Sequence, residues 1–321
     1  MLQYFMKRLL VLLPKLLLIT LVIFFAMELM PGDVVSRSLD PEQIAGLTAE
    51  QLEILREAKG LNDPAIVRYF RWLVGLFQGD FGYSLNSGTP VRVLLAQRLP
   101  ATLSLAALGL VFSTILGIGF GFVAAIKKNT PLDYSCTAAG ILGISIPEFF
   151  FGMLFIMVFS ITLKWLPASG RVSVDDTSIW GYLKHLIMPS FCLGIALIAT
   201  LMRYTRSSML DVMGKDYIKT ARAKGLRESV VYTRHCFRNG CAPVMLLLVG
   251  RLGMLISGTT IIENVFSYPG MGNLFLGTLT TKDTPVCMTI LLLTSSAVLI
   301  TTFLSDIVLA FLDPRVRFGK E

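Results

Sequence analysis

Six long runs of apolar residues limit what this 321-residue chain can fold into. Each run has about 18 residues or more, which is enough for an α-helix to cross the hydrocarbon core of a bilayer. None of them alternates apolar and polar residues as a barrel strand does. The sequence therefore predicts an all-α integral membrane protein with six transmembrane helices. The predicted spans are about Leu9–Met30, Ala101–Ile126, Cys136–Leu163, Leu186–Met202, Pro243–Ile262 and Val286–Leu312.

The composition agrees with a membrane protein. Hydrophobic residues make up 54% of the chain, against about 45–50% in ordinary globular proteins. The first apolar run begins near Lys7 and Arg8, as a signal peptide would. It is too long for one, however, and no small-residue cleavage site follows near Met30. We therefore expect a retained first helix.

The distribution of Lys and Arg predicts the orientation in the membrane. With the N-terminus inside, the inner segments hold sixteen of these residues and the two short outer loops hold four. Nine of the sixteen lie between Arg203 and Ala242. An excess of cations in the cytoplasmic loops is typical of membrane proteins. Both termini are therefore predicted to be cytoplasmic, and the net charge of +8 indicates topology and contact with lipid or a partner rather than nucleic-acid binding.

This topology divides the chain into four parts. The first helix is followed by a long extracytoplasmic helical insertion, and the transmembrane core contains a cytoplasmic loop between the fourth and fifth helices. The predicted parts are residues 1–30 (N-terminal region and first helix), 31–100 (insertion), 101–312 (core, with the loop at 203–242) and 313–321 (cytoplasmic tail).

Two helices are predicted within the insertion. Thr48 and Gln51 have the spacing of a capping box at the start of the first one. Asp63 is expected to cap the second, with Pro64 in its first turn. Apolar residues between positions 66 and 77 recur at helical spacing on one face. We expect this amphipathic helix to lie at the membrane surface or against the outer rim of the bundle.

The inner segment from Gly214 to Leu226 predicts a short helix with two stripes. The basic stripe holds Lys215, Lys219 and Arg222. The neighbouring stripe of small or apolar groups holds Ile218, Ala221 and Gly225, and Gly225 is expected to end the helix. Such a helix could rest on anionic headgroups or enter a groove on another protein, and charge alone does not separate the two. The small stripe favours the groove, because it allows a close approach of backbones.

Residues Asp216 to Leu226, with the sequence DYIKTARAKGL, resemble the "EAA" coupling loop of ABC-importer permeases of the dipeptide, oligopeptide and nickel family. Lys-Thr-Ala stands here in place of the core triplet Glu-Ala-Ala, as in that family. Further segments resemble the family in the same order along nearly the whole chain. They are Pro31–Asp33, Gly60–Pro64, Gly79–Gly82, Arg98–Leu103, Ser145–Pro147, Leu166–Gly170, Arg206–Leu210, Arg238-Asn239, Glu263–Gly270 and Asp313–Arg315.

The resemblance implies a non-catalytic, multi-pass permease subunit of a binding-protein-dependent importer in a bacterial cytoplasmic membrane. The implied partners are a second, homologous permease, two ATPase subunits and an extracytoplasmic substrate-binding protein. ATP and Mg²⁺ would be used by the ATPase subunits, because this chain has no P-loop and is expected to bind no cofactor. The residues implied in coupling are Lys215, Asp216, Tyr217, Ile218, Lys219, Thr220, Ala221, Arg222, Ala223, Lys224, Gly225 and Leu226.

Ionisable residues inside the predicted spans are the candidates for contact with the cargo, because charge is costly in the bilayer. They are Glu28, Glu148, Arg251 and Glu263. For Glu263, which falls in the Glu-x-x-Phe-x-x-Pro-Gly pattern of the family, a structural role at the outer gate is the favoured interpretation. Lys15 and Asp306 lie close enough to the inner ends of their helices to reach the interface.

Short peptides are the expected cargo, and nickel or a nickel chelate is the alternative. Asp216-Tyr217 and Arg171–Ser173 resemble the dipeptide members, whereas Ile261–Asn264 resembles the nickel members. No His or Cys cluster in the spans would hold a bare Ni²⁺, and the spacing of His235, Cys236 and Cys241 does not make a four-ligand zinc site. A chelated metal would need no such ligands.

Two other classes of membrane protein are more remote alternatives. An intramembrane enzyme would need paired Asp motifs or a Ser/His pair within the spans, and the two histidines of this chain make no such set. An ATP-independent carrier is expected to have repeated halves and no docking loop.

Overall fold

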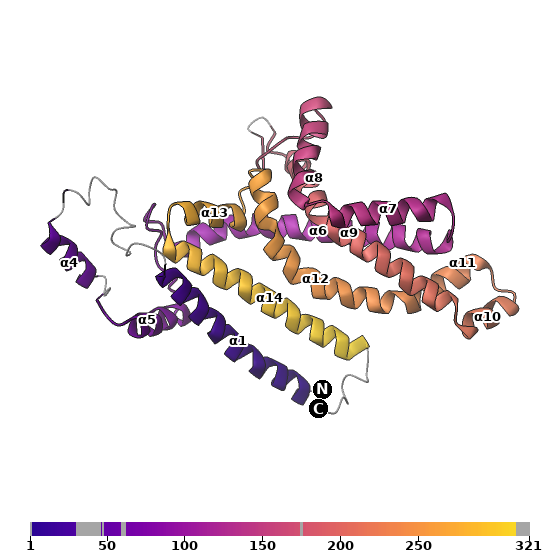
Figure 1. Ribbon diagram of the computed structural model, residues 1–321, viewed down its shortest axis with the longest axis horizontal. Coiled ribbons are helices and arrows are strands. Elements are labelled where there is room, and N and C mark those ends of the chain that lie inside the picture. The colour runs from indigo at the N-terminus through magenta and orange to yellow at the C-terminus, as the bar shows by residue number, and fades with distance from the viewer. Residues whose placement is uncertain (1, 30–45, 47, 59–61, 174–175, 313–321) are drawn as a thin grey trace.

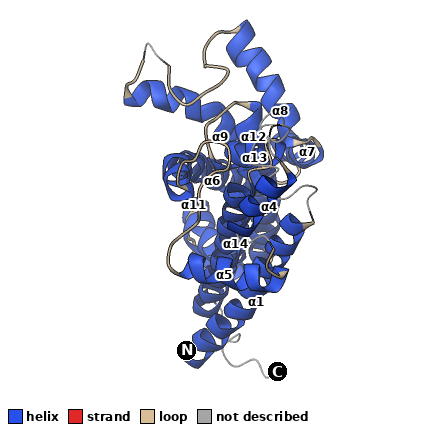
Figure 2. Ribbon diagram, turned by 90° about the vertical axis from the view of Figure 1, so that its left-hand side faces the viewer, coloured by secondary structure: helices blue, strands red, loops and turns tan. Residues whose placement is uncertain are grey.

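The computed structural model describes residues 2–29, 46, 48–58, 62–173 and 176–312, and the regular structure in these residues is helical (Figures 1 and 2). In the described residues between α1 and α6 there are two short helices, and long helices make up the core. In chain order they are α1 (Leu2–Glu28), α4 (Ala49–Ala58), α5 (Ala65–Phe77), α6 (Val91–Ile126), α7 (Pro131–Ser145), α8 (Glu148–Phe155), the π-helix η1 (Ile156–Thr162), α9 (Ile179–Met213), α10 (Asp216–Ala223), α11 (Glu228–Val230), the π-helix η2 (Val231–Phe237), α12 (Arg238–Val265), α13 (Met271–Thr280) and α14 (Thr284–Leu312).

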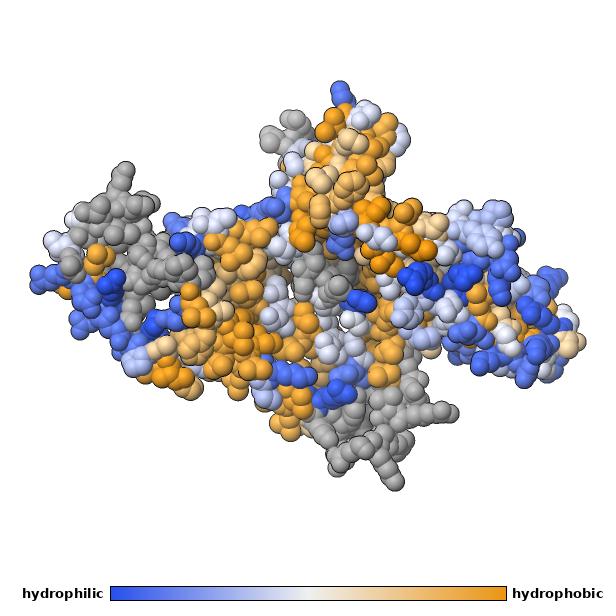
Figure 3. Space-filling model, viewed as in Figure 1, coloured by the Kyte–Doolittle hydropathy of each residue, from blue (hydrophilic) through white to orange (hydrophobic). Residues whose placement is uncertain are grey.

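The helices that can cross a membrane confirm the predicted class. Among the described residues, α1, α6, α9 and α14 are long and apolar enough, and α7 with α8 and η1 adds a fifth if that bent pair is one span. The predicted span Pro243–Ile262 lies inside the 28-residue helix α12. Hydrophilic surface gathers at the two ends of the long axis, over α4 and around α10 and α11 (Figure 3). The count of six spans stays a prediction.

The predicted span Cys136–Leu163 is not a straight helix. α7 ends at Ser145, α8 begins at Glu148, and the two are bent by 105°. Pro147 is the cause, because proline lacks an N–H and disfavours a helical conformation in the residue before it. Ile146 accordingly has an extended backbone, with φ −92° and ψ 129°. The prediction of one continuous helix here is wrong, and a single bent crossing stays a prediction.

α6 packs along α9 through a narrow face, and this is the most extensive contact between two helices in the described residues. Every fourth residue of that face is small: Gly109, Ser113, Gly117 and Gly121. A Cβ added at Gly117 would lie 2.7 Å from the Leu201 Cβ, and one added at Gly121 would lie 2.7 Å from the Thr205 Cβ. Neither fits without a shift of the helices. Small residues at this spacing allow membrane helices to approach closely.

α1 runs beside α14, and the insertion is anchored on α1. Arg8 on α1 pairs with Asp306 on α14 at 2.9 Å, so the described ends of the chain lie at the same end of the bundle (Figure 1). At the other end of α1, Tyr69 of α5 is buried against Phe24, and its hydroxyl is 3.0 Å from the Thr20 Oγ1. Within the insertion, α5 is therefore packed against the first helix.

The start of α4 was predicted correctly and the cap of α5 was not. Thr48 N–H donates to Gln51 Oε1 at 2.9 Å, and Gln51 N–H donates to Thr48 Oγ1 at 3.3 Å, which is the predicted capping box. In α5 the cap position belongs to Pro64, which has no side-chain acceptor. Asp63 therefore lies one residue too early, and its carboxylate pairs with Arg71 at 2.6 Å.

The apolar residues of α5 are divided between two sides of the helix. Tyr69 packs against α1, whereas most of the predicted stripe stays exposed on this chain. The exposed residues are Ile66, Val67, Phe70, Val74 and Phe77. The expectation that α5 lies at the membrane surface or on the rim of a larger assembly therefore stays open.

The close contact between α6 and α9 makes a prediction about two glycines of α6. Gly117→Val should lower the free energy of unfolding by about 1–3 kcal/mol, because overpacking a tight contact forces helices apart. Gly119→Val adds the same side chain to the same helix where no atom lies within 4 Å of the new Cβ. Thermal unfolding of both variants in detergent checks this. Equal losses of stability at the two positions would show that the contact with α9 does not cause the loss.

Candidate coupling site

The backbone of α10 ends as the sequence predicts. Gly225 has φ +76°, in the left-handed region that glycine adopts without strain. Its N–H donates to the Arg222 carbonyl at 2.9 Å, and the Leu226 N–H donates to the Ala221 carbonyl at 3.4 Å. These two bonds form a Schellman motif. No atom lies within 4 Å of a Cβ added at Gly225, so the position needs glycine for its backbone conformation and not for space.

One face of α10 packs against the rest of this chain. Ile218 is fully buried and Ala221 is 7% exposed. They lie in a cluster with Ala125 of α6 and Met209 of α9, to which η2 adds Val231 and Cys236. The interpretation that Ile218 and Ala221 enter a groove on a partner is therefore wrong. They join the helix to its own bundle instead, because the two long helices end beside it.

The rest of the α10 surface is exposed, and we call one side of it the outward face. It consists of Tyr217, Thr220, Ala223 and Lys224. Tyr217, Thr220 and Lys224 are three and four residues apart, which places them side by side on a helix. The central residues Thr220 and Ala223 are small. A partner can therefore approach this face closely, with Tyr217 and Lys224 at its edges.

Most of the predicted basic stripe is paired with carboxylates. Lys219 Nζ lies 2.9 Å from Asp216 Oδ1. Arg222 donates to Glu228 from Nε at 2.8 Å and from Nη2 at 3.3 Å, which joins α10 to α11. The Arg222 hydrogen bonds hold the pKa of Glu228 below its usual range. Lys215, at the cap position, is exposed. This pairing reduces the attraction of the helix to anionic headgroups and leaves the outward face as its distinctive surface.

Glu263 is a fully buried carboxylate that joins three helices. Its Oε1 accepts from Thr102 Oγ1 on α6 at 2.6 Å, and its Oε2 accepts from the Asn273 N–H on α13 at 3.0 Å. A Cβ added at Gly270 would collide with this carboxylate. Thr102 Oγ1 also accepts from the Met271 N–H at 2.8 Å. These contacts support a structural role at the junction of α6, α12 and α13.

The other three candidates for cargo contact lie apart. Glu28 pairs with Arg68 of α5 and so holds the insertion on α1. Glu148 is half-buried in the first turn of α8, directly after the bend. Arg251 is exposed near the middle of α12. The ion pairs among the described residues do not include one between Glu148 and Arg251, so the four residues do not form one site within this chain.

Sequence reasoning missed the ion pair of Asp133 and Arg206. Arg206 Nε and Nη2 on α9 donate to the two carboxylate oxygens of Asp133 on α7 at 2.5 and 2.8 Å. The Asp133 side chain is only 2% exposed and also accepts from the Asn129 N–H at 3.0 Å. The available signal was an acid in the first turn of a helix that begins with Pro131. It was missed because Asp133 lies just before the predicted span.

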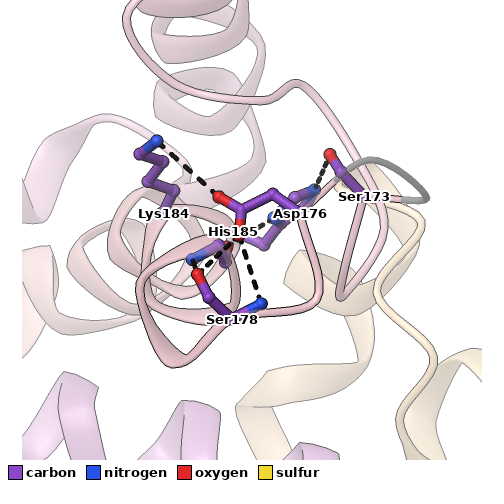
Figure 4. Close-up of polar contacts among 6 residues, drawn as sticks. Ser173, Asp176, Ser178, Lys184 and His185 are labelled. Carbon is purple, nitrogen blue, oxygen red and sulfur yellow. Dashed lines mark hydrogen bonds and ion pairs between the residues drawn. The ribbon is translucent and has the colours of Figure 1, made fainter.

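The start of α9 is held by a polar cluster rather than by a metal (Figure 4). Ser178 caps the helix by accepting from the Gly181 N–H at 3.1 Å, and its hydroxyl donates to Asp176 at 2.5 Å. His185 Nδ1 lies 2.9 Å from the Gly181 carbonyl. Among the described residues, no three His, Cys, Asp or Glu side chains lie close enough to hold a metal ion. The family-like segments Pro31–Asp33 and Asp313–Arg315 lie outside the described part of the chain.

Comparison with known proteins shows the family of the chain. Residues 117–318 match the family described as the binding-protein-dependent transport system inner membrane component, and residues 1–106 match the N-terminal region described for the same systems. The oligopeptide transport system permease protein AppB of Bacillus subtilis is 38% identical over 98% of this chain and 99% of its own length. The glutathione transport system permease protein GsiC of Escherichia coli K12 is 35% identical over 99% of this chain and all of its own length.

A solved structure shows the same fold. A chain of the MetNI methionine ABC transporter, in an inward-facing conformation, superposes with a TM-score of 0.57 at 15% identity. The match covers 69% of this chain and 97% of that one. The chain therefore belongs to the family of binding-protein-dependent transport system inner membrane components, as a transmembrane permease subunit of an ABC importer.

Proposed function

We propose that this chain forms half of the pathway by which an importer moves short peptides across a bacterial cytoplasmic membrane. The full-length similarity to an oligopeptide permease and a glutathione permease supports this cargo, since both names describe small peptides. A second, homologous permease supplies the other half of the pathway. An extracytoplasmic binding protein delivers the cargo to the outer side, where the insertion at residues 31–100 lies.

The outward face of α10 is the proposed contact with a separate ATPase subunit. One observation carries this assignment: the helix buries Ile218 and Ala221 in its own bundle while Tyr217, Thr220, Ala223 and Lys224 stay exposed. The excess of Lys and Arg in this loop places it, with both termini, on the cytoplasmic side. Two ATPase subunits, one for each permease, use ATP and Mg²⁺ there, and this chain itself is not catalytic.

Coupling follows from how α10 is attached. When the ATPase pair closes on ATP, the α10 helices move with the surfaces that hold them. Because Ile218 is buried in one cluster with residues of η2 and of the ends of α6 and α9, that motion passes through this cluster to the two helices of the central contact. The pathway then changes between inward- and outward-open states, since ATP binding favours one of two pre-existing arrangements.

A matched pair of threonines tests the outward face. Thr220 on α10 and Thr233 on η2 are both exposed, and each hydroxyl donates to the carbonyl four residues earlier, at 3.1 and 2.7 Å. Thr220→Trp should reduce ATP-driven uptake by about tenfold or more, because a bulky group at the centre of a docking surface costs about 2 kcal/mol of binding. Thr233→Trp should leave uptake near normal. Membrane insertion and co-purification of the ATPase are measured alongside, and retained ATPase binding in Thr220→Trp would contradict the assignment.

A second pair of variants tests the end of α10. Gly225→Val places a β-branched residue at φ +76°, which costs about 1–2 kcal/mol and should loosen the last turn. Gly225→Asn should retain most transport, because Asn tolerates this conformation. We expect lost uptake with normal membrane insertion in the valine variant only. Unchanged uptake in Gly225→Val would show that the shape of α10 does not matter for coupling.

The cargo is tested by uptake of a labelled tripeptide and of radioactive Ni²⁺ in cells with and without this gene. Loss of peptide uptake alone is the expected result. Loss of nickel uptake alone would replace the proposed cargo but leave the permease assignment intact. Purified binding protein from the same system, titrated with both ligands, provides the control for indirect effects on growth.

A further inference from the structure

A groove between α7 and α9 is lined only by hydrogen-bond donors and cations. Its lining residues are Thr137, Arg203, Tyr204, Arg206 and Ser207. Each can donate a hydrogen bond, and none carries a negative charge. Arg203, Arg206 and Ser207 lie three and four residues apart on α9, so they face the same side of that helix. Such a surface suits a ligand that offers only acceptors and bears negative charge.

The two arginines have different surroundings. Arg206 is held from behind by Asp133, which uses its Nε and Nη2 and offsets its charge. The hydrogen bonds of the described residues leave its Nη1 group unengaged. No carboxylate among those residues pairs with Arg203, whose side chain is exposed. Arg203 therefore supplies the net positive charge of the groove, and Arg206 supplies a donor in a fixed orientation.

The depth of the groove in the membrane narrows the choice of ligand. Arg203 is the first charged residue after the apolar stretch Leu186–Met202 of α9, which places it at the boundary between hydrocarbon and headgroups. On α7, Tyr134 and Ile141 lie one turn before and one turn after Thr137, and they are 64% and 53% exposed. The groove thus opens onto a surface that can contact an acyl chain. An acidic protein partner would not need that apolar flank.

We propose that this groove binds the headgroup of an anionic phospholipid in the inner leaflet. The phosphate diester accepts from Arg203, the free Nη1 of Arg206 and the neighbouring hydroxyls, while an acyl chain lies along Tyr134 and Ile141. Basic pockets between transmembrane helices on the cytoplasmic side are a known way to hold such headgroups. A zwitterionic lipid binds less well, because its ammonium group meets Arg203. The site does not depend on which cargo the importer carries.

Bound lipid would also contact the two helices that the Asp133–Arg206 pair already joins. Thr137 belongs to α7, and Arg203 and Ser207 belong to α9. The headgroup therefore adds a second bridge between these helices, beside the buried ion pair. An anionic membrane is expected to stabilise the inner end of the chain, as any ligand does that binds only the folded state.

The test uses the purified full-length chain and native mass spectrometry with added phosphatidylglycerol or phosphatidylcholine. We expect selective retention of phosphatidylglycerol, weakened about fivefold in Arg203→Gln, the equivalent of about 1 kcal/mol for one basic residue near an anionic surface. Arg234→Gln removes an exposed arginine of η2 outside the groove and should leave binding unchanged. Arg206 is left intact, because its removal would leave the buried Asp133 carboxylate without its counter-ion.

Three results would overturn the proposal. Equal retention of the two lipids would exclude recognition of the anionic headgroup. Full retention of phosphatidylglycerol in Arg203→Gln would place the lipid elsewhere on the chain. Complete displacement of the lipid by inorganic phosphate would show that the groove takes free phosphate. Melting temperatures of the same variants in each lipid give an independent reading, since the extra stability in phosphatidylglycerol should be smaller in Arg203→Gln and unchanged in Arg234→Gln.

Discussion

The rest of the structure depends on how closely α6 approaches α9. Apolar side chains gain little by leaving lipid for another helix, so membrane helices associate through close backbone contact and polar groups. Gly117 and Gly121 allow that approach, and the Ser113 hydroxyl lies within hydrogen-bonding distance of the Gly194 carbonyl across the contact, at 3.2 Å. The central core includes residues of both helices and of α12. A larger side chain on this face would therefore disturb more than one pair of helices.

α10, the proposed coupling element, lies at the continuation of the same contact. One turn beyond Gly121 on α6 is Ala125, and one turn beyond Thr205 on α9 is Met209. Ile218 of α10 is buried in the cluster that contains both of them. The position of α10 is thus tied to η2 and to the two helices that define the core. This is why a short loop helix with paired surface charges can hold one defined orientation.

Features that depend on residues close together in the sequence were predicted better than features that depend on distant residues. Four of the six predicted spans, the capping box at Thr48 and the left-handed Gly225 follow from patterns within single segments of the chain, and the structure has the corresponding helices and turns there. The direction in which Ile218 faces was wrongly predicted, because the α-helical pattern marks an apolar stripe but not what covers it. Whether the outward face of α10 contacts an ATPase stays a prediction.

Other features depend on residues far apart in the chain. Asp133 and Arg206 are separated by 73 positions. Glu263 meets Thr102 across 161 positions. Neither partner could be assigned from one sequence, although the i, i+4 series of small residues in α6 was legible there and would have indicated its packing face. The bend at Pro147 also has a local cause in the sequence, but the proline lies inside a long hydrophobic run that was interpreted as one helix.

That bend lets one short segment meet two parts of the bundle. α6, α9 and α10 contribute buried side chains to one cluster, and the Asp133–Arg206 pair joins α7 to α9. α8 begins after the extended residue Ile146, runs in a different direction from α7, and contacts α12 as well as α9. A straight helix could not follow α9 and also reach α12 in this way, so the proline at position 147 ties α12 to the central pair of helices.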